Sequence, residues 1–358
     1  MKKKTILVNL IYLKDLYRGF GQIALNYGNY FAENYRADQS DYQLYLLMPK
    51  KMFGMFGNEV KYISSTNWFR RHCRFLMPNF DVWHNLQYPS RFRPAFPRAT
   101  KYIFTLHDFN TLTIEYEGSK KSIEKNRRRL QRNINMATAL VSISEFTKNE
   151  TDKYMNLHGK SIQVIQNAVE DITNLPCKQP DVEIKSPFLF SISVFRPTKN
   201  FHTLLDMMKL MPDKHLYIAG KNTSDYGKMI KARIANEKIE NVHLLGMVST
   251  EEKAWLYRHC EAFVFPSILE GFGLPIVEAL QFGKPVICAK RTSLIEIGDK
   301  YVGFWEHFEP EYMKQTVEDY LANFSAQKAE QAKEYANLFS YEKYFEQYEK
   351  LYRELING

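Results

Sequence analysis

Short runs rich in β-branched and aromatic residues alternate along this chain with longer stretches of helical periodicity. This alternation is typical of βαβ units, in which helices cover both faces of a parallel sheet. The runs form two series. The first comprises residues 5–10, 42–47, 101–106, 139–143 and 162–165, and the second comprises residues 188–194, 215–219, 242–245, 262–265 and 286–289. The sequence therefore predicts an α/β protein with two parallel sheets.

A segment with three prolines and no apolar periodicity, residues 174–187, separates the two series. Because 358 residues exceed what one hydrophobic core usually supports, we expect two domains. The expected N-terminal domain covers residues 1–173, the linker 174–187 and the C-terminal domain 188–339. From Tyr341 to Leu355, aromatic residues and leucines recur at helical spacing. Residues 340–358 are therefore expected to form an amphipathic helix that packs back on the N-terminal domain.

Composition and hydropathy limit the class of protein. With 45% hydrophobic and 25% charged residues, a mainly disordered chain is excluded. The longest interior apolar run, Phe188 to Val194, is far shorter than the roughly 20 residues that cross a bilayer. Lys2 to Lys4 and the apolar residues after them resemble a secretory signal, but Lys14 and Asp15 follow at once and no cleavage site appears. We expect a first β-strand there and a cytoplasmic protein.

Residues 265–280, FPSILEGFGLPIVEAL, form the most informative motif. The motif follows an apolar strand-like run and opens a helical one. Pro275 suits the first helical position, and Gly271 and Gly273 allow backbone conformations that a side chain would block. The N–H groups and the dipole at a helix start attract anions. The motif therefore predicts a phosphate site.

Two glutamates bracket this predicted phosphate site. Glu270 lies in the loop, and Glu278 lies about one turn inside the helix. Carboxylates beside a phosphate repel it unless they accept hydrogen bonds from neutral hydroxyl groups. A nucleotide sugar has such hydroxyls on both sides of its diphosphate, on the ribose and on the hexose. A glycine turn with two solvated glutamates is the alternative for an isolated Glu-Gly-x-Gly, but the whole string is more specific.

The string from Glu270 to Glu278, with two glutamates separated by seven residues, resembles the motif of the retaining glycosyltransferases of family 4. The same resemblance extends over Gly246, Leu256-Tyr257, Gly283-Lys284-Pro285-Val286, Ser293 and Glu296, and it covers nearly all of residues 188–297. That family has the GT-B fold, in which two Rossmann-like domains with parallel sheets face a central cleft. The resemblance implies the same fold here.

The resemblance also implies roles in the C-terminal domain. Glu270 would contact the transferred sugar, Glu278 the ribose, and the backbone at Gly273-Leu274 the diphosphate. Met247-Val248 would lie beside the base. Residues 195–200 resemble the family's Pro-Arg-Lys-Asn turn.

In that turn, Lys199 falls on the family's lysine, where a fixed cation would neutralise charge on the leaving diphosphate. An ordinary lysine at a helix start is the alternative. Thr198 occupies the arginine position, so Arg196 is included by proximity.

The N-terminal half resembles the family more loosely. Arg18-Gly19-Phe20-Gly21-Gln22 is similar to the glycine loop that abuts the donor, with a plain turn as the alternative. Thr105-Leu106-His107-Asp108 is similar to a segment whose histidine faces the reacting sugar. A structural histidine is the alternative, although the carboxyl end of a strand favours a site residue. Residues 166–170 depart from the family's Pro-Asn-Gly-Val-Asp at three positions, so the domain junction is expected to differ in detail.

The candidate catalytic residues are therefore Glu270, Lys199, His107 and Arg196, and the candidate donor-binding residues are Gly19, Gly21, Met247, Val248, Gly271, Phe272, Gly273, Leu274 and Glu278. No Asp-x-Asp motif and no His/Cys cluster with ligand spacing occurs, and the four cysteines lie far apart. We expect no metal, no disulfide framework and no cofactor, because the nucleotide sugar is a substrate.

Positive charge is concentrated in the first half of the chain. Residues 1–180 contain 27 Lys/Arg and 15 Asp/Glu, whereas residues 181–358 contain 22 and 25. Cations and bulky apolar residues are interleaved over residues 50–53, 68–76 and 125–132, as at an anionic membrane surface. Solvated helix faces are the alternative. No nucleic-acid-reading module is recognisable, so nucleic acid is not an expected partner.

Together these features predict a glycosyltransferase that retains anomeric configuration. It would move a hexose from a nucleotide diphosphate sugar to a lipid-linked or saccharide acceptor in cell-surface polysaccharide assembly. The His-Asp segment favours GDP-mannose over a UDP-hexose by resemblance only. A sugar-nucleotide epimerase of the same fold and a non-catalytic sugar-nucleotide or lipid-surface binding module are the alternatives. The expected location is the cytoplasm, with peripheral contact to the inner face of the membrane.

Overall fold

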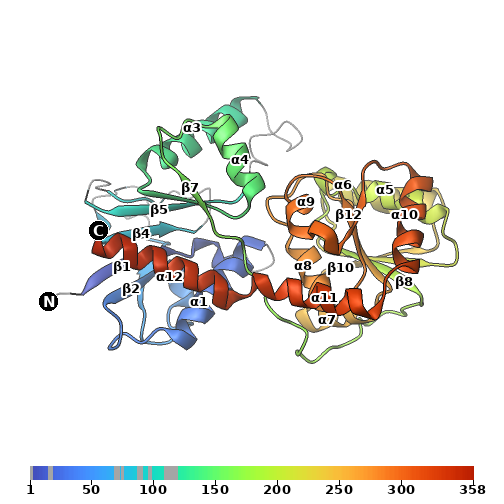
Figure 1. Ribbon diagram of the computed structural model, residues 1–358, viewed down its shortest axis with the longest axis horizontal. Helices are drawn as coiled ribbons and strands as arrows, with labels where there is room; N and C mark the ends of the chain where they lie inside the picture. Colours follow the sequence, from blue (N-terminus) through green and yellow to red (C-terminus); the bar gives the residue numbers. More distant parts are fainter. Residues whose placement is uncertain are drawn as a thin grey trace. The chain divides into compact units, whose positions relative to one another are not determined.

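The computed structural model describes residues 3–14, 19–67, 73, 76–86, 92–95, 99–108 and 120–358, which divide into two units (Figure 1). Unit 1 contains the described residues of 1–112, those of 118–166, and 341–358, and unit 2 contains 167–340. Residues 174–187 form neither helix nor strand and lie inside unit 2. Each unit has an α/β architecture of its own, built around one parallel sheet.

In its described part, unit 1 has a seven-stranded sheet in the order β3-β2-β1-β4-β5-β6-β7. The strands are β1 (Lys4–Asn9), β2 (Tyr42–Met48), β3 (Lys61–Ser64), β4 (Val82–Asn85), β5 (Lys101–Leu106), β6 (Ala139–Ser142) and β7 (Ile162–Val164). All paired neighbours are parallel. The interior strand β1 buries Ile6, Leu7 and Val8 completely, as a strand covered on both faces should.

Unit 2 has a six-stranded parallel sheet in the order β10-β9-β8-β11-β12-β13. The strands are β8 (Phe188–Ile192), β9 (His215–Ala219), β10 (Val242–Gly246), β11 (Ala262–Phe265), β12 (Val286–Ala289) and β13 (Gly303–Trp305). Counted from the first strand of each sheet, both units have the order 3-2-1-4-5-6, and β7 extends the first sheet. This is the Rossmann order, so the expected α/β fold of two Rossmann-like domains is confirmed.

Helices connect many of the parallel strands and also follow the last strand. In the described part of unit 1 they are η1 (Ile11–Lys14), α1 (Gly19–Asn34), η2 (Lys50–Met52), α3 (Lys120–Met136), α4 (Glu145–Tyr154) and α12 (Tyr341–Asn357). Those of unit 2 are η5 (Pro197–Lys199), α5 (Phe201–Lys209), α6 (Asp225–Asn236), α7 (Thr250–His259), α8 (Leu274–Gln281), α9 (Ser293–Gly298), η6 (Asp299–Tyr301), α10 (Pro310–Ala322), α11 (Ala326–Ala336) and η7 (Asn337–Phe339). Within the described ranges, no helix has both the length and the apolarity of a membrane span.

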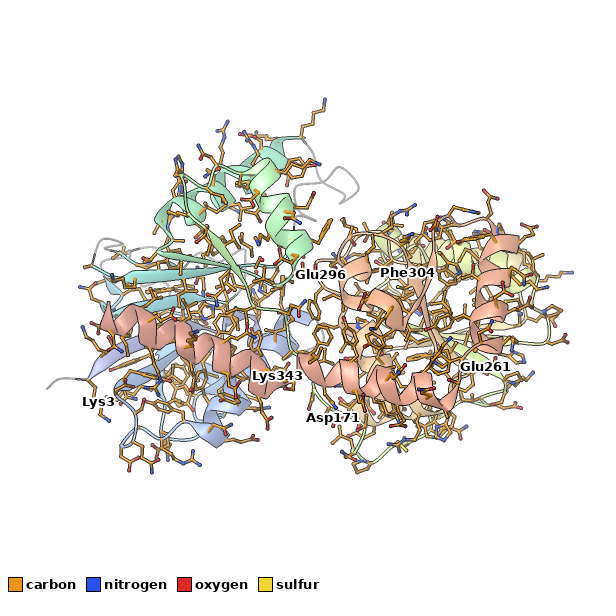
Figure 2. All side chains as sticks on the ribbon, viewed as in Figure 1. Lys3, Asp171, Glu261, Glu296, Phe304 and Lys343 are labelled. Carbon is orange, nitrogen blue, oxygen red and sulfur yellow. The ribbon has the colours of Figure 1, made fainter. Side chains whose placement is uncertain are left out.

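The last helix, α12, belongs to unit 1 although it follows the whole of unit 2 in sequence. Its buried face consists of Tyr344, Phe345, Tyr348, Leu351, Tyr352 and Ile356, and Lys343 lies on its exposed face (Figure 2). The hydroxyl of Tyr352 lies 2.7 Å from Nδ1 of His84 on β4, and Nε2 of His84 lies 2.9 Å from Oγ1 of Thr105 on β5. These buried polar contacts fix α12 against the sheet of unit 1.

The strand order reverses between β1 and β4 in unit 1 and between β8 and β11 in unit 2. In open parallel sheets, ligands bind outside the carboxyl ends of the strands at such a reversal. In unit 2, the segments that leave β8 and β11 at this point carry Lys199 and Glu270. The fold of unit 2 alone therefore brings two predicted site residues to the same edge of one sheet.

Candidate functional site

The two segments beside the reversal in unit 2 are hydrogen-bonded to each other. The backbone N–H of Ile268 donates to the carbonyl oxygen of Thr198 at 2.9 Å, and Oγ of Ser267 donates to the same oxygen at 3.2 Å. Asn200, in the left-handed conformation with φ of 57°, ends the short helix η5 and begins α5. These contacts fix the chain on both sides of the predicted site.

Lys199 and Glu270 form an ion pair at this position. Nζ of Lys199 lies 2.5 Å from Oε1 of Glu270, and the two side chains are only 12% and 14% exposed. The ammonium group also lies 5.9 Å from the centre of the Phe265 ring. A charge-assisted hydrogen bond in a poorly solvated position is stronger than one at the surface. The pair therefore presents one cation and one anion that a polar ligand could separate.

The helix start that follows Glu270 is shaped by Gly273. This residue is the N-cap of α8 and has φ of 109°, a conformation that residues with side chains rarely adopt. A Cβ atom on Gly273 would lie 2.6 Å from Cδ2 of Leu294. Pro275 occupies the second helical position of α8. The backbone at Gly273 and Leu274 thus forms the positive end of the α8 dipole, where an anion is stabilised.

Residues at the start of α9 form hydrogen bonds with the loop from Glu270 to Phe272. Oγ of Ser293 lies 3.0 Å from the carbonyl oxygens of both Glu270 and Phe272, and the N–H of Glu270 donates to Oγ1 of Thr292 at 3.2 Å. Gly271 and Phe272 are buried. The ring of Phe272 packs edge-on against Phe339, so this side chain is part of the core and does not face a ligand.

Glu278 lies on α8 and has two fixed partners on α7. Its Oε1 accepts a hydrogen bond from Nζ of Lys253 at 2.8 Å, and its Oε2 accepts one from the hydroxyl of Tyr257 at 2.8 Å. Burial, and secondarily the negative charge of Glu278, raise the pKa of the Tyr257 hydroxyl well above its usual value, so Tyr257 remains a donor. The sequence did not predict Lys253, because no motif pairs residue 253 with residue 278. Its position one turn before Tyr257 on the same helix face was the available signal.

The remaining donor-side candidates of unit 2 follow the carboxyl ends of β8 and β10 in the same sheet. Arg196 is half-buried at the N-cap of η5, and its carbonyl oxygen accepts the N–H of Lys199 at 2.9 Å. Gly246 ends β10 with φ of 71°. Met247 follows it with 50% of its surface exposed, and Val248 is half-buried. An exposed apolar side chain at a strand's carboxyl end is suited to contact a nucleotide base.

In unit 1, Gly19 and Gly21 lie in the first turn of α1, and Arg18 of the same segment is outside the described residues. His107 follows β5 and is 4% exposed. Its Nε2 donates to the carbonyl oxygen of Leu86 at 2.5 Å, and its ring packs edge-on against Phe20 of α1 at 4.8 Å. Burial lowers the pKa of His107 to about 4 although the Leu86 carbonyl opposes the shift. The neutral ring therefore keeps a lone pair on Nδ1 as an acceptor.

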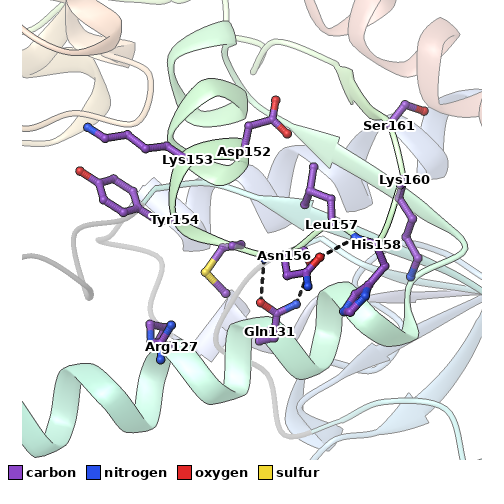
Figure 3. A pocket seen from close by; sticks show the side chains of 12 residues that line it. Arg127, Gln131, Asp152, Lys153, Tyr154, Asn156, Leu157, His158, Lys160 and Ser161 are labelled. Atoms are coloured by element: carbon purple, nitrogen blue, oxygen red, sulfur yellow. Dashed lines mark hydrogen bonds between the residues drawn. The ribbon is translucent and has the colours of Figure 1, made fainter.

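A separate hollow of about 820 Å³ lies in unit 1, between α3 and the segment from α4 to β7 (Figure 3). Much of its polar lining is already paired. Gln131 hydrogen-bonds with both the carbonyl and the N–H of Asn156, and Nζ of Lys160 donates to the carbonyl oxygens of Ile134, Asn135 and Ala137. The hollow contains none of the predicted site residues. Over the described ranges, no group of three or more His, Cys, Asp or Glu is arranged to hold a metal.

Two sequence families match the chain. The family described as "Glycosyl transferases group 1" matches residues 178–339, and the one described as "Glycosyltransferase Family 4" matches residues 29–171. O-antigen chain mannosyltransferase B of Escherichia coli is 25% identical over 63% of this chain and 63% of its own length. The uncharacterized glycosyltransferase MJ1178 of Methanocaldococcus jannaschii is 29% identical over 71% of this chain and 68% of its own. The O-antigen chain mannosyltransferase RfbU of Salmonella typhimurium is 27% identical over 44% of each chain.

Solved structures resemble the fold over its full length. A glycosyltransferase from Rickettsia africae ESF-5 has a TM-score of 0.73 at 16% identity and covers 100% of both chains. Sucrose-phosphate synthase from Thermosynechococcus elongatus has a TM-score of 0.75 at 15% identity, covering 99% of this chain and 100% of its own. Anabaena HepE in complex with UDP and glucose has a TM-score of 0.71 at 17% identity, covering 98% and 100%. At these identities the likeness concerns the fold alone.

Proposed function

Because the chain belongs to the group 1, family 4 glycosyltransferases and has their two-domain GT-B fold, we propose that it is a retaining hexosyltransferase. It transfers a hexose from a nucleotide diphosphate sugar to a saccharide or lipid-linked acceptor in the assembly of a cell-surface polysaccharide. The relatives described as O-antigen chain mannosyltransferases support this role and favour mannose as the sugar. GDP-mannose is therefore the first donor to test, and a UDP-hexose is the second.

One arrangement in unit 2 carries the proposal. The Lys199–Glu270 ion pair, the glycine-shaped start of α8 and the Glu278 carboxylate all lie on segments that follow β8 and β11. Lys199 and the α8 N-terminus supply the positive charge that a diphosphate needs. Glu270 and Glu278 supply acceptors for sugar hydroxyls. The proposal assigns the transferred sugar to Glu270, the ribose to Glu278 and the base to Met247-Val248.

In the proposed reaction, the acceptor hydroxyl oxygen attacks the anomeric carbon on the face from which the diphosphate leaves. The bond between that carbon and the phosphate oxygen breaks, and the nucleoside diphosphate keeps the electron pair. The hydroxyl proton passes to an oxygen of the leaving phosphate. Lys199 and the α8 amides stabilise the charge on this leaving group. In this proposal the positive charge is supplied by the chain and not by a metal.

Residues of unit 1 have proposed roles at the reacting sugar. Gly19 and Gly21 begin α1, whose N-terminus suits the donor's phosphates or sugar. His107 is held by Leu86 with its Nδ1 lone pair available, so it is assigned to a hexose hydroxyl as a neutral acceptor. Its lowered pKa excludes a role as a cation near neutral pH.

Helix α3 is the proposed contact with an anionic membrane surface. It exposes Lys120, Lys121, Lys125, Arg127, Arg128, Arg129 and Arg132, and its one acidic residue, Glu124, pairs with Arg127 and Arg128. Residues 68–72, 74 and 75, on which the expectation of a basic, aromatic surface also rested, lie outside the described residues.

Vesicle cosedimentation tests this contact. Vesicles with phosphatidylglycerol should bind the protein in a salt-sensitive way, because surface charges are screened over about 10 Å at 0.1 M salt. A Lys125→Glu/Arg129→Glu variant should lose this binding, whereas a Lys228→Glu/Lys231→Glu control on α6 should keep it. Equal binding to neutral phosphatidylcholine vesicles would reject the contact.

A thermal-shift panel with UDP, GDP and ADP, followed by sugar nucleotides of the best base, tests the donor assignment. A ligand that binds only the folded state stabilises it by about 2.7 kcal/mol at a concentration of 100 Kd. One nucleoside diphosphate should raise the melting temperature, and the shift should shrink markedly in Glu278→Ala. Transfer to acceptor, followed by mass spectrometry with the matching sugar nucleotide, then separates a transferase from an epimerase. No shift with any of the three would contradict the proposed function.

A further inference from the structure

The carboxylate of Glu278 is held from two sides by one face of a neighbouring helix. Lys253 and Tyr257 lie four residues apart on α7, and therefore on the same face of that helix. Each donates to a different oxygen of Glu278, at 2.8 Å in both cases. The side chains of Lys253 and Glu278 are 22% and 17% exposed. This is a directed, poorly solvated contact and not a surface ion pair.

The helix that carries both donors is firmly fixed. Oγ of Ser249 accepts the N–H of Glu252, and the Glu252 carboxylate accepts the N–H of Ser249, which completes a capping box at the start of α7. Tyr257 is completely buried, and its ring packs against Phe190 and Phe263. Lys253 and Tyr257 therefore project from a rigid base, and their positions determine the orientation of the Glu278 carboxylate.

Lys253 and Glu278 also interact electrostatically with a second carboxylate, that of Glu170. Although Glu170 is exposed as a whole residue, desolvation of its carboxylate raises its pKa, Lys253 lowers it, and the negative charge of Glu278 raises it. Glu170 is therefore within electrostatic range of both residues. Two carboxylates and one ammonium form a cluster in which Lys253 offsets the repulsion between Glu170 and Glu278. Without Lys253, the repulsion between Glu170 and Glu278 would not be offset from this side, and the Glu278 carboxylate would lose one of its two donors.

We propose that Lys253 is a positioning residue that, together with Tyr257, orients Glu278 to bind the vicinal hydroxyls of a ribose. This inference rests on the proposed function, in which Glu278 holds the ribose. An ionised carboxylate has about four lone-pair sites on its two oxygens. Lys253 occupies one site on Oε1, and Tyr257 occupies one on Oε2. Each oxygen therefore keeps a site for one hydroxyl, which matches the two donors of a cis-diol.

The specificity for ribose over 2′-deoxyribose measures this orientation directly. We would determine calorimetric affinities of the wild-type chain for UDP, GDP and their 2′-deoxy analogues. The wild-type chain should prefer the ribonucleotide of its own base by roughly tenfold or more, as expected for a hydrogen bond to a charged group. In Lys253→Met the affinity for the ribonucleotide should fall about tenfold, which corresponds to about 1.4 kcal/mol. The affinity for the 2′-deoxy analogue should change little, so the preference should nearly disappear.

Three variants make the test specific. Lys253→Arg keeps a donor and a positive charge and should restore most of the preference. Tyr257→Phe keeps the buried ring while removing the second donor, and should also reduce the preference. Lys228→Met removes an exposed lysine that pairs with Asp225 on α6, and should leave both affinities unchanged.

The outcomes distinguish the possible failures. If Lys253 merely stabilises the packing of α7 on α8, both affinities should fall by the same factor and the preference should stay intact, which would overturn the positioning role. If the wild-type chain binds neither UDP nor GDP, the proposed function itself fails. A wild-type chain that binds one of them without preferring it over the 2′-deoxy form would reject the assignment of Glu278 to ribose.

Discussion

Lys199 and Glu270 each have a partner before any donor binds. Their ion pair is nearly enclosed, so each charge is costly to leave alone. A nucleotide sugar could exchange this pair for two new interactions, in which its diphosphate takes Lys199 and its hexose hydroxyls take Glu270. The pair thus holds the Lys199 cation and the Glu270 hydrogen-bond acceptor in defined positions before the donor binds. Two separate sequence motifs predicted these residues, but their direct contact depends on how the β8 and β11 segments meet and could not be read from either motif.

Glu270→Gln tests this exchange at the level of one residue. The substitution should strengthen binding of the nucleoside diphosphate about tenfold, because Lys199 loses its competitor and the phosphate loses a repulsive neighbour. The melting temperature of the ligand-free variant should fall, since Lys199 is left without its counter-charge. Sugar transfer should decrease strongly, because Glu270 is the proposed contact of the hexose.

Calorimetry with UDP and GDP checks the binding, and Glu306→Gln is the matched control. Glu306 pairs with Lys290 in a much more exposed ion pair of the same unit, so the control should leave the affinity unchanged. An unchanged or weaker affinity of Glu270→Gln would show that the diphosphate does not compete for Lys199.

At the scale of elements, the start of α8 depends on the backbone conformation of one glycine. Gly273→Ala should weaken nucleoside diphosphate binding at least tenfold, because alanine is strained at φ of 109° and its Cβ would lie 2.6 Å from Cδ2 of Leu294, so that the first turn of α8 should shift. Gly57→Ala has a similar positive φ of 76° in unit 1 with no atom within 4 Å of the added Cβ, and it controls for backbone strain. Equal binding by Gly273→Ala and the wild-type chain in calorimetry would place the diphosphate elsewhere.

The same scale shows what the sequence could predict. Apolar runs gave β5, β9, β11 and β12 with the observed ends, because buried parallel strands are largely apolar. The strands β3, β4 and β13 were missed. β4 contains His84 and Asn85, whose burial depends on tertiary hydrogen bonds, and β13 has only three residues. Whether a short or polar segment forms a strand depends on its neighbours in the sheet. Its own residues therefore give little basis for predicting a strand.

In the candidate site, too, features that are local in sequence were predicted and contacts between distant residues were not. The motif from Glu270 to Glu278 predicted the helix start and the special backbone conformation of its glycines, which are local properties of consecutive residues, whereas Gly273 as the N-cap was not predicted. Lys253 is 25 residues before Glu278 in sequence and meets it only because α7 packs beside α8. Contacts of this kind depend on packing, which the spacing of residues within one motif does not describe. The roles of the site residues remain predictions until a donor is bound.

At the scale of the whole molecule, the chain returns to unit 1 through α12 and buries a histidine beneath it. His84 is fully buried between Tyr352 and Thr105, and burial followed by the nearby His107 lowers its pKa to about 3. Because the folded pKa lies below the ordinary value of 6.5, the unfolded chain binds the proton more readily. The contribution of neutral, buried His84 to the free energy of unfolding is therefore complete above about pH 6.5. This contribution is lost as the pH falls below that value.

Acid titration should consequently destabilise unit 1 through His84. Its contribution to the free energy of unfolding should fall by about 1.4 kcal/mol per pH unit as the pH decreases from about 6.5. Hydrogen exchange of the β1 and β4 amides at several pH values measures this slope. In His84→Gln the free energy of unfolding should depend less steeply on pH. The difference from the wild-type chain should correspond to about one proton. An identical slope in both proteins would show that His84 is not neutral in the folded state.

The central claim is that a diphosphate binds at the start of α8 between Lys199 and Glu278. A crystal structure of the protein with the nucleoside diphosphate that gives the largest thermal shift tests it most directly. We predict phosphate oxygens against the backbone N–H groups at Gly273 and Leu274, ribose hydroxyls on Glu278, and Lys199 turned from Glu270 toward the phosphate. A well-ordered nucleotide bound at another place, with these groups unchanged, would contradict the account.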